Sequence, residues 1–266
     1  MSVSSLQALY SSPLDIEALL RSYPRVRPAL SEAHQAIYVK EYRANRSGSG
    51  PLFGAIAYLE RWMHRAVTAS GTGPILELGA GTLNHLKFEP TTNGYDVVEP
   101  FRVLWENLPE RSLVRSFYND LSDVPTNGSY RHIVSIAVLE HAVDLPWMVA
   151  RSATLLTEEG DFNAAFPSEG GLLWGLSWRL TTGLAYRIRT GLDYSIVMRH
   201  EHVNSADEIL ALIGYFFDEV ELRRFPLPSK HLSFYSAASA RHPKLDRCKR
   251  LIDERLRFSE QKKTLS

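Results

Sequence analysis

Short apolar runs alternate with helical stretches through the middle of the chain, and this alternation predicts a parallel β-sheet with crossover helices. Two later apolar runs, at 216–226 and 233–240, are expected to form an antiparallel pair that ends the sheet. The chain is therefore expected to be an α/β protein with a doubly wound, mostly parallel sheet. The expected parallel strands are Ile75–Leu78, Tyr95–Val98, Leu113–Phe117, Ile133–Val138 and Asp161–Phe166.

Apolar residues at helical spacing predict helices before, between and after these strands. Residues 52–69 are predicted to form a helix along the sheet, and residues 143–157 form the clearest crossover helix. The C-terminal segment, 241–266, is predicted to be an amphipathic helix whose polar face meets solvent or a partner. Its apolar positions are Leu245, Cys248, Ile252 and Leu256.

The N-terminal part, residues 1–50, is expected to be a helical extension of the main domain, which covers 51–240. Ser12 is a candidate N-cap, because Pro13 after it suits the first position of a helix. The small-residue stretch RSGSGP at 46–51 predicts a hinge between the two parts.

Residues 168–204 do not fit a minimal α/β unit, because the segment is too long for a simple connection between strands. This insertion follows the fifth expected strand and mixes Trp, Leu and Tyr with arginines. Such a composition suits a lid over a pocket or a weak contact with a membrane surface. An extra helical hairpin that fills core is the alternative.

The overall composition narrows the classes of partner. The 266 residues include 30 basic and 30 acidic ones, so no overall field favours nucleic acid, and a small or neutral acceptor fits better. The single cysteine, Cys248, excludes an internal disulfide and a cysteine-based zinc site, which indicates a reducing compartment. We expect a cytoplasmic protein, because the N-terminus lacks the pattern of a signal peptide and no apolar run is long enough for a transmembrane helix.

The segment ILELGAGTLNH, at 75–85, predicts a buried strand that enters a glycine turn. Gly79 and Gly81 let backbone N–H groups approach a ligand without a Cβ in the way. Asn84 stands where a dinucleotide fingerprint has its third glycine, and this difference disfavours a nicotinamide dehydrogenase.

Polar residues follow the later strands at the edge where open α/β sheets bind ligands. Glu99 ends the second expected strand, where a carboxylate can accept hydrogen bonds from a ribose diol; a cap for the turn near Phe101 is the alternative. Asp120 follows the third strand and could accept a hydrogen bond from an adenine amino group. The fourth strand ends in Leu139, Glu140 and His141.

Taken in this order, Glu77-x-Gly79-x-Gly81, Glu99, Asp120 and VLEHAVDLP resemble the motifs of class I S-adenosylmethionine-dependent methyltransferases. The resemblance is closest to the small-molecule branch whose fourth strand ends in Leu-Glu-His, and it covers residues 52–240. It implies a Rossmann-like, seven-stranded sheet with an antiparallel last strand, and S-adenosylmethionine as the cofactor. Leu83 departs from the pattern, since many members have a third glycine there, so the helix after the turn is expected to start late or to be short.

The resemblance also implies roles for single residues. The turn of Gly79, Ala80 and Gly81 would face the methionine part of the cofactor. Glu77 would orient this turn or reach the cofactor's amino group through water, and Glu99 would bind the ribose hydroxyls.

Further cofactor contacts are implied beyond the turn. Asp120 and Leu121 would flank the adenine, and Leu139 would lie below the sulfonium. Tyr42 and Arg43 belong to an N-terminal segment that folds over the cofactor in many related enzymes, so they are candidates for contacts with its carboxylate or with the acceptor. An ordinary surface helix is the alternative for this segment.

An alcohol acceptor needs a base, and histidine is the usual group that removes its proton near neutral pH. His141 lies just past the fourth strand, where a packing role is equally open, and His200 and His202 at the end of the insertion could reach the same place. A metal site at His200 and His202 is disfavoured, because no further Asp or His grouping stands out. Ser168 and Glu169, after the fifth strand, could hold acceptor hydroxyls or merely end the strand.

The sequence therefore predicts an enzyme that transfers a methyl group from S-adenosylmethionine to oxygen of a small acceptor, such as a sugar or a glycan-linked group. The Trp, Tyr and Arg content of the insertion suits stacking on sugars and pairing with phosphates. Nitrogen, carbon and lipid acceptors stay open, and so does a non-catalytic protein that binds the cofactor without turnover. The oligomeric state is not predicted.

Overall fold

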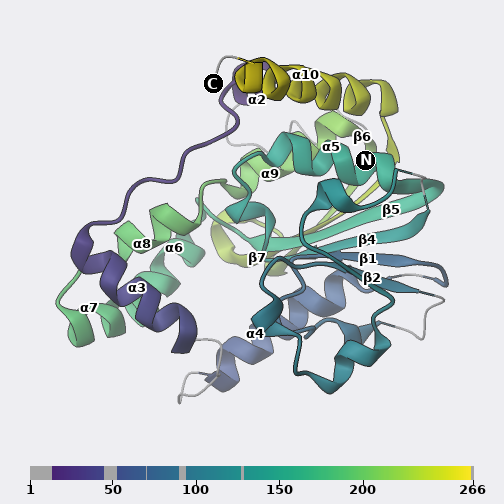
Figure 1. Cartoon of the computed structure of the whole chain (residues 1–266). Helices are drawn as coiled ribbons and strands as arrows, with labels where there is room; N and C mark the ends of the chain where they lie inside the picture. Colours follow the sequence, from purple (N-terminus) through teal and green to yellow (C-terminus); the bar gives the residue numbers. More distant parts are fainter. Residues whose placement is uncertain (1–13, 45–52, 70, 90–93, 127–128, 265–266) are drawn as a thin grey trace.

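The strands of the protein form one sheet with helices on both faces (Figure 1). The computed structural model describes residues 14–44, 53–69, 71–89, 94–126 and 129–264. In chain order the strands are β1 (Ile75–Leu78), β2 (Tyr95–Val98), β3 (Ser116–Tyr118), β4 (Tyr130–Ile136), β5 (Leu156–Pro167), β6 (Phe217–Pro226) and β7 (Ser233–Pro243). Their order in the sheet is β3-β2-β1-β4-β5-β7-β6. β7 runs antiparallel to β5 and β6 and the other neighbours are parallel, so the expected doubly wound, seven-stranded fold with an antiparallel last strand is confirmed.

β1 and β2 begin and end where their apolar runs do, but the expected bounds of β3, β4 and β5 are wrong. β5 starts at Leu156 rather than Asp161, directly after α5. β3 starts at Ser116 rather than Leu113, because Pro109–Leu113 form a 3-10 helix, η4, with proline at its first turn. β4 starts at Tyr130 rather than Ile133. It stops at Ile136, since the positive φ of 53° at Ala137 ends the extended backbone.

Helix α4 (Phe53–Val67) covers one face of the sheet, while α5 (Leu145–Leu155) and α9 (Ala206–Phe216) cover the other (Figure 1). α4 and α5 confirm the two helices expected beside the sheet, and α5 ends early because β5 begins directly after it. The C-terminal helix α10 (Leu245–Thr264) packs across α5 and buries Cys248 completely. The expected amphipathic helix therefore closes this layer.

The N-terminal extension contains α2 (Ile16–Arg21) and α3 (Glu32–Ala44), joined by an extended segment. The N-cap of α2 is Asp15, whose side chain accepts hydrogen bonds from two backbone N–H groups of the first turn. The expectation of Ser12 as the N-cap is therefore wrong for this helix. Ser12 itself and the expected hinge at 46–51 lie outside the described residues.

The insertion folds into helices beyond the carboxyl ends of β4 and β5, where it lies beside α3 (Figure 1). Its elements are α6 (Leu172–Trp178), the π-helical turn η7 (Arg179–Gly183), α7 (Leu184–Thr190) and α8 (Tyr194–Glu201). Throughout the described ranges, each helix is too short or too polar to cross a bilayer.

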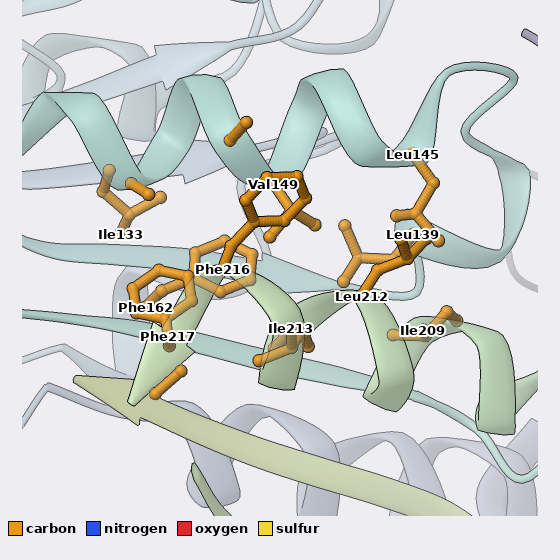
Figure 2. Packing of buried hydrophobic residues seen from close by; sticks show 14 of the residues in the cluster. Ile133, Leu139, Leu145, Val149, Phe162, Ile209, Leu212, Ile213, Phe216 and Phe217 are labelled. Carbon is orange, nitrogen blue, oxygen red and sulfur yellow. The ribbon is translucent and has the colours of Figure 1, made fainter. Parts of the chain in front are cut away.

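The largest hydrophobic cluster lies between the sheet and the layer of α5 and α9 (Figure 2). The rings of Phe162 and Phe217 stack with their centroids 5.9 Å apart, and Phe216 lies in the same cluster at the end of α9. Leu139 and Leu212 are fully buried in this cluster. Burial of each such side chain stabilises the folded state by about 1.5–3 kcal/mol. The core thereby fixes the loop after β4, to which Leu139 belongs.

We expect Leu212→Ala to lower the free energy of unfolding by about 2–5 kcal/mol, because it removes buried methyl groups and leaves a cavity. Leu113→Ala is the matched control, since Leu113 is 66% exposed and its truncation should change stability by less than about 0.5 kcal/mol. Urea denaturation of both variants measures the difference. Equal stability losses would contradict this assignment of the core.

Candidate functional site

The glycine turn follows β1 and has a backbone that requires glycine. Gly79 and Gly81 both have positive φ, at 65° and 53°. A Cβ on Gly79 would lie 2.5 Å from a methyl carbon of Val138, which is closer than the two atoms can approach. The turn therefore brings its backbone against the loop after β4, with Ala80 buried between the glycines.

The carboxylate of Glu99 holds this turn from the end of β2. Its Oε2 accepts a hydrogen bond from the backbone N–H of Gly81 at 2.8 Å, and its Oε1 accepts one from the N–H of Phe101 at 2.9 Å. The structure thus joins Glu99 to the glycine turn and shows the cap at Phe101 that was the alternative to a ribose-binding role. Glu99 is only 5% exposed, so its position is tightly fixed.

Glu77 lies inside the sheet below the turn. Its Oε2 accepts a hydrogen bond from the hydroxyl of Tyr95 on the neighbouring strand at 2.7 Å. Burial raises the pKa of Glu77 to about 7, against the opposing effects of the charge of His85 and the Tyr95 hydrogen bond. Glu77 therefore exchanges its proton near neutral pH rather than in the acidic range of an exposed glutamate.

The segment after the turn is not a regular helix. Leu83 is buried with a positive φ of 59°, and only a short 3-10 helix, η2 (Leu86–Phe88), follows. This confirms that the helix after the turn is late and short. His85 anchors the segment: its Nε2 lies 2.6 Å from Oε1 of Glu89, and its Nδ1 lies 3.2 Å from Nδ1 of His64 on α4.

The pairing of His64 with His85 was missed from the sequence, since the two lie on different elements. Burial, together with the nearby charges of His85 and Lys87, lowers the pKa of His64 to about 4. His64 is therefore neutral at physiological pH. The only signal in the sequence was a histidine on a helix expected to face the sheet.

Asp120 and Leu121 lie at the carboxyl end of β3, as expected. Asp120 is exposed and caps the 3-10 helix η5 (Leu121–Asp123), where its Oδ1 accepts a hydrogen bond from the backbone N–H of Ser122 at 2.8 Å. Leu121 is buried in the main hydrophobic cluster. The structure thus gives the Asp120 side chain a capping role at this edge of the sheet.

The loop after β4 forms a single 3-10 turn, η6 (Leu139–His141). The side chain of Leu139 is fully buried among the leucines of α5 and α9 (Figure 2). The backbone of the turn, rather than the leucine side chain, therefore lies at the carboxyl-end edge of the sheet.

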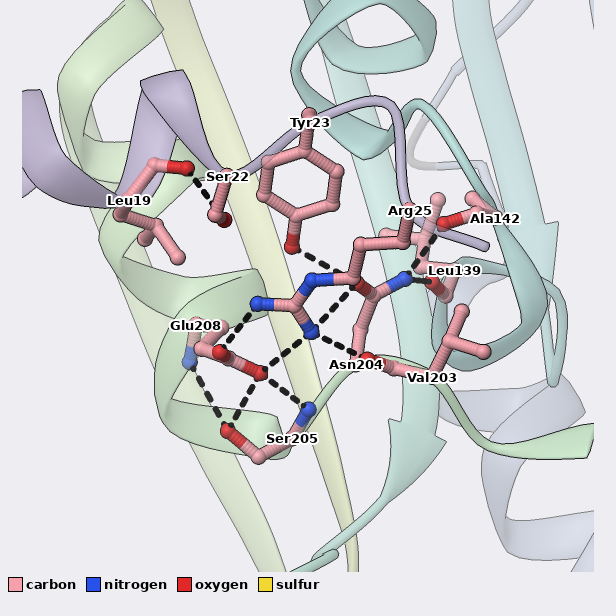
Figure 3. Close-up of polar contacts among 10 residues, drawn as sticks. All are labelled: Leu19, Ser22, Tyr23, Arg25, Leu139, Ala142, Val203, Asn204, Ser205 and Glu208. Atoms are coloured by element: carbon pink, nitrogen blue, oxygen red, sulfur yellow. Dashed lines mark hydrogen bonds and ion pairs between the residues drawn. The ribbon is translucent and has the colours of Figure 1, made fainter. Parts of the chain in front are cut away.

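Asn204 clamps this turn to the end of the insertion and to the N-terminal extension (Figure 3). Its side-chain amide donates hydrogen bonds to the carbonyl oxygens of Leu139 and Ala142, both at 2.7 Å. Its Oδ1 accepts one from the hydroxyl of Tyr23 at 2.6 Å and one from Arg25 at 3.3 Å. Asn204 and Tyr23 are almost completely buried, so these bonds satisfy their polar groups away from water.

The clamp brings His141 and His202 together, with ring centroids 4.9 Å apart. Nδ1 of His141 lies 2.9 Å from the carbonyl oxygen of Glu201. His200 does not join them: its Nδ1 lies 2.7 Å from the carbonyl oxygen of Pro28 in the extension. The expectation that all three histidines converge is therefore wrong for His200, because α8 continues to Glu201 and turns that side chain elsewhere.

Glu169 supports His202 from the other end of the insertion. Its Oε2 lies 2.9 Å from Nδ1 of His202 and accepts a hydrogen bond from the indole N–H of Trp174 at 2.7 Å. Burial acts to raise the pKa of Glu169, but the hydrogen bonds from His202 and Trp174 outweigh it and the pKa is lowered. Ser168, by contrast, is fully buried and bonded to Ser236 at 2.9 Å, so it braces β7 and does not face an acceptor.

Glu140 lies beside the two histidines and is almost completely buried. Its Oε2 has no hydrogen-bond partner among the residues that the structure describes. One ligand atom each from Glu140, His141 and His202 lies within 4.8 Å of the others, and two imidazoles with a carboxylate are donors that zinc accepts. This group could hold a metal ion, although Nδ1 of His202 already faces Glu169.

A cavity of about 640 Å³ opens within the insertion. His202 and Glu169 form part of its wall, and Arg179, Arg187 and Arg199 supply positive charge. The insertion therefore surrounds a space that has His202 in its wall. A volume of this size is typical of small-molecule sites.

The N-terminal extension contacts the same region. Arg27 donates a hydrogen bond to the carbonyl oxygen of His141 at 2.8 Å, and the hydroxyl of Tyr38 donates one to Glu201. Arg27 was missed from the sequence, because nothing local marks it, whereas Tyr38 belongs to the N-terminal segment that the resemblance places over the cofactor. The side chains of Tyr42 and Arg43, further along α3, lie outside the described residues.

Glu140 makes the stability of the protein depend on pH. Burial raises its pKa from 4.5 to about 7, so the folded protein holds this proton more tightly than the unfolded chain. The resulting stabilisation is fully present below pH 4.5 and is lost as the pH rises to 7. We expect Glu140→Gln to flatten this decline in the free energy of unfolding, measured by urea denaturation across that range. The exposed Glu110→Gln should follow the wild type, and a Glu140→Gln profile parallel to the wild type would contradict the assignment.

Similar proteins are found by structure and not by sequence: no family model and no curated protein matches the chain. A SAM-dependent methyltransferase of Thermotoga maritima, a possible histamine N-methyltransferase, is 15% identical, with a TM-score of 0.52 over 76% of this chain and 95% of its own. A protein solved in complex with the Trm112 methyltransferase activator of Haloferax volcanii is 13% identical, with a TM-score of 0.52 over 81% of this chain and 100% of its own. The chain has the fold of the class I S-adenosylmethionine-dependent methyltransferases.

Proposed function

We propose that this protein is an enzyme that transfers a methyl group from S-adenosylmethionine to oxygen of a small acceptor. Two observations carry the proposal: Glu99 is joined to the glycine turn, and His202, whose ring packs against His141 of the loop after β4, lines the cavity of the insertion. The turn would receive the cofactor and the cavity the acceptor. The shared fold supports the same assignment.

The residues of the turn and of Glu99 fit the cofactor. A carboxylate offers about four lone-pair sites, and the N–H groups of Gly81 and Phe101 occupy only two of them. Glu99 can therefore still accept hydrogen bonds from the two hydroxyls of a ribose. The close approach of Gly79 to Val138 leaves the backbone of Ala80 and Gly81 to face the methionine part.

Residues at the carboxyl ends of the other strands would make further contacts with the cofactor. Asp120 and Leu121 would flank the adenine from the end of β3, and the turn that begins at Leu139 would lie near the sulfonium. Glu77 supports the strand that leads into the glycine turn. Tyr42 and Arg43 stay predictions for the cofactor carboxylate.

When bound, S-adenosylmethionine supplies an already activated methyl group, so the protein must align the acceptor, exclude water and remove a proton. We assign proton removal to His202. With its Nδ1–H donated to the ionised Glu169, Nε2 carries the lone pair that accepts the hydroxyl proton. Glu169 also stabilises the imidazolium that forms, in the way that a carboxylate supports a catalytic histidine elsewhere. His141 packs against this ring and positions it.

The wall of the cavity supports a polar acceptor with aromatic or anionic character. Arg179, Arg187 and Arg199 outnumber the acidic Glu169 and Asp193, and Trp178 and Tyr194 offer stacking surfaces. A sugar or a glycan-linked group with a phosphate suits this mixture. The open cavity favours turnover over the non-catalytic alternative, for which the insertion would have to block the pocket. Nitrogen, carbon and lipid acceptors, and a cytoplasmic location, stay predictions.

We expect Glu99→Gln to weaken the binding of S-adenosylhomocysteine by about 1–3 kcal/mol, because the variant loses a charged acceptor for the ribose hydroxyls. Titration calorimetry measures the affinity, with the exposed Glu110→Gln as control. Unchanged affinity would remove Glu99 from the cofactor site, and a wild-type protein that does not bind the product would refute the proposed cofactor.

We expect His202→Gln to lower kcat by about 10²–10⁴-fold with the affinity for S-adenosylhomocysteine retained, because it removes the base and leaves the turn intact. His200→Gln is the matched control and should keep wild-type turnover, since His200 faces Pro28. A panel of sugar and sugar-phosphate acceptors, assayed for S-adenosylhomocysteine formation, provides the measurement. Equal activities of the two variants would exclude His202 as the base, and activity that a chelator abolishes and zinc restores would assign His202 to a metal site.

A further inference from the structure

The insertion carries a stripe of exposed aliphatic side chains along one continuous helical stretch, α6, η7 and α7, which we call the stripe helix. The aliphatic residues recur at every fourth position, and at least half of each residue's surface is exposed to solvent. They are Leu172 (72% exposed), Leu176 (55%), Leu180 (61%), Leu184 (50%) and Ile188 (78%). A contiguous apolar surface of this kind on a folded chain marks an interaction site.

The π-helical turn η7 keeps this stripe on one side of the helix. In a regular α-helix, residues four apart drift by about 40° around the axis, so the stripe from Leu172 to Ile188 would rotate by about 160°. The wide turn Arg179–Gly183 accommodates an extra residue, which sets the phase back by about 100°. The irregular turn thus brings Leu184 and Ile188 back toward the line of Leu172 and Leu176.

The opposite side of the stripe helix is anchored to the protein. Tyr186 is only 3% exposed, and its ring lies 5.1 Å from that of Tyr194. Trp174 is bonded to Glu169, and its ring lies 5.8 Å from that of Tyr235 on β7. The aliphatic stripe therefore faces outward from a fixed helix and does not fill core.

The charged residues of the stripe helix are all positive. Residues 172–190 include three arginines, Arg179, Arg187 and Arg189, and no aspartate or glutamate. The guanidinium of Arg179 lies 4.5 Å from the ring centre of Trp178, a pairing suited to the boundary between water and an apolar phase. Leucines, tryptophans and arginines without acidic residues form the pattern of a helix that lies in a membrane interface.

We infer that the stripe helix docks the protein on an anionic lipid surface. The aliphatic side chains would enter the boundary of the acyl chains while the arginines pair with lipid phosphates. A second copy of the chain is a poorer occupant, because a two-fold contact would place the same arginines opposite one another. Docking does not depend on methyl transfer. The same helix also lines the cavity through Trp178, Arg179, Gly183, Leu184 and Arg187, so the bound lipid surface would lie against the cavity wall.

Vesicle flotation tests this inference. The wild-type protein should float with vesicles of equimolar phosphatidylcholine and phosphatidylglycerol, weakly or not at all with phosphatidylcholine alone, and less as salt increases. Leu180→Glu with Ile188→Glu should reduce the bound fraction by about tenfold or more, because both side chains lose their apolar contact with lipid. The matched control is Val103→Glu with Leu113→Glu, whose side chains are 75% and 66% exposed on another part of the chain.

Three outcomes would overturn the inference. The first is a wild-type protein that stays in solution with the anionic vesicles. The second is an equal loss of binding in the two double variants. The third is a wild-type dimer in sedimentation velocity that the Leu180/Ile188 variant converts to a monomer without any vesicle binding, which would assign the stripe to a second copy. None of these measurements requires an active methyltransferase, so failure here leaves the proposed function untouched.

Discussion

The hydrogen bonds of Asn204 are the constraint on which the loop after β4 depends, at the carboxyl-end edge of the sheet. One buried amide satisfies two carbonyl oxygens of the loop after β4 and accepts from Tyr23 and Arg25 of the N-terminal extension. Three segments that are distant in sequence therefore meet at a point where water is excluded. A buried polar group without its partner costs about 1–3 kcal/mol, so these bonds select one arrangement of the segments over others.

The ion pair between Arg25 and Glu208 extends this constraint. Nη2 of Arg25 lies 2.5 Å from Oε1 of Glu208, and the other oxygen of Glu208 accepts a hydrogen bond from the backbone N–H of Ser205 at the start of α9. The extension is thus tied to the helix that forms the core layer, rather than to the surface alone. The polar clamp and the hydrophobic cluster consequently hold the loop after β4 from opposite sides, with Leu139 in the cluster and its carbonyl oxygen in the clamp.

The parts of the fold that the sequence predicts are those set by local pattern. β1 and β2 are fully buried apolar runs with sharp ends, so their bounds follow from the residues alone. β3 differs because a 3-10 helix after Pro109 takes up Leu113, an apolar residue that local pattern assigns to the strand. The glycine turn and Glu99 were also predictable, since each follows a strand whose end is marked.

The arrangement of the histidines could not be predicted in the same way. His141 and His202 meet only because α8 ends at Glu201 and Asn204 binds the loop after β4, which are contacts between segments about sixty residues apart. His200 lies only two residues before His202, but it is inside α8, whereas His202 follows the end of that helix. Nδ1 of His200 therefore faces the carbonyl oxygen of Pro28. The pair of His64 and His85 depends likewise on packing between α4 and the segment after the glycine turn.

The hydrogen bond between Glu169 and His202 has a consequence for how such a protein can diversify. These two residues stand at the start and at the end of the insertion, so their contact closes the intervening helices into a loop with a fixed base. The entropy of closing a loop grows only slowly with its length. The segment between them can therefore lengthen, shorten or exchange its helices over evolutionary time while the contact between Glu169 and His202 keeps its geometry.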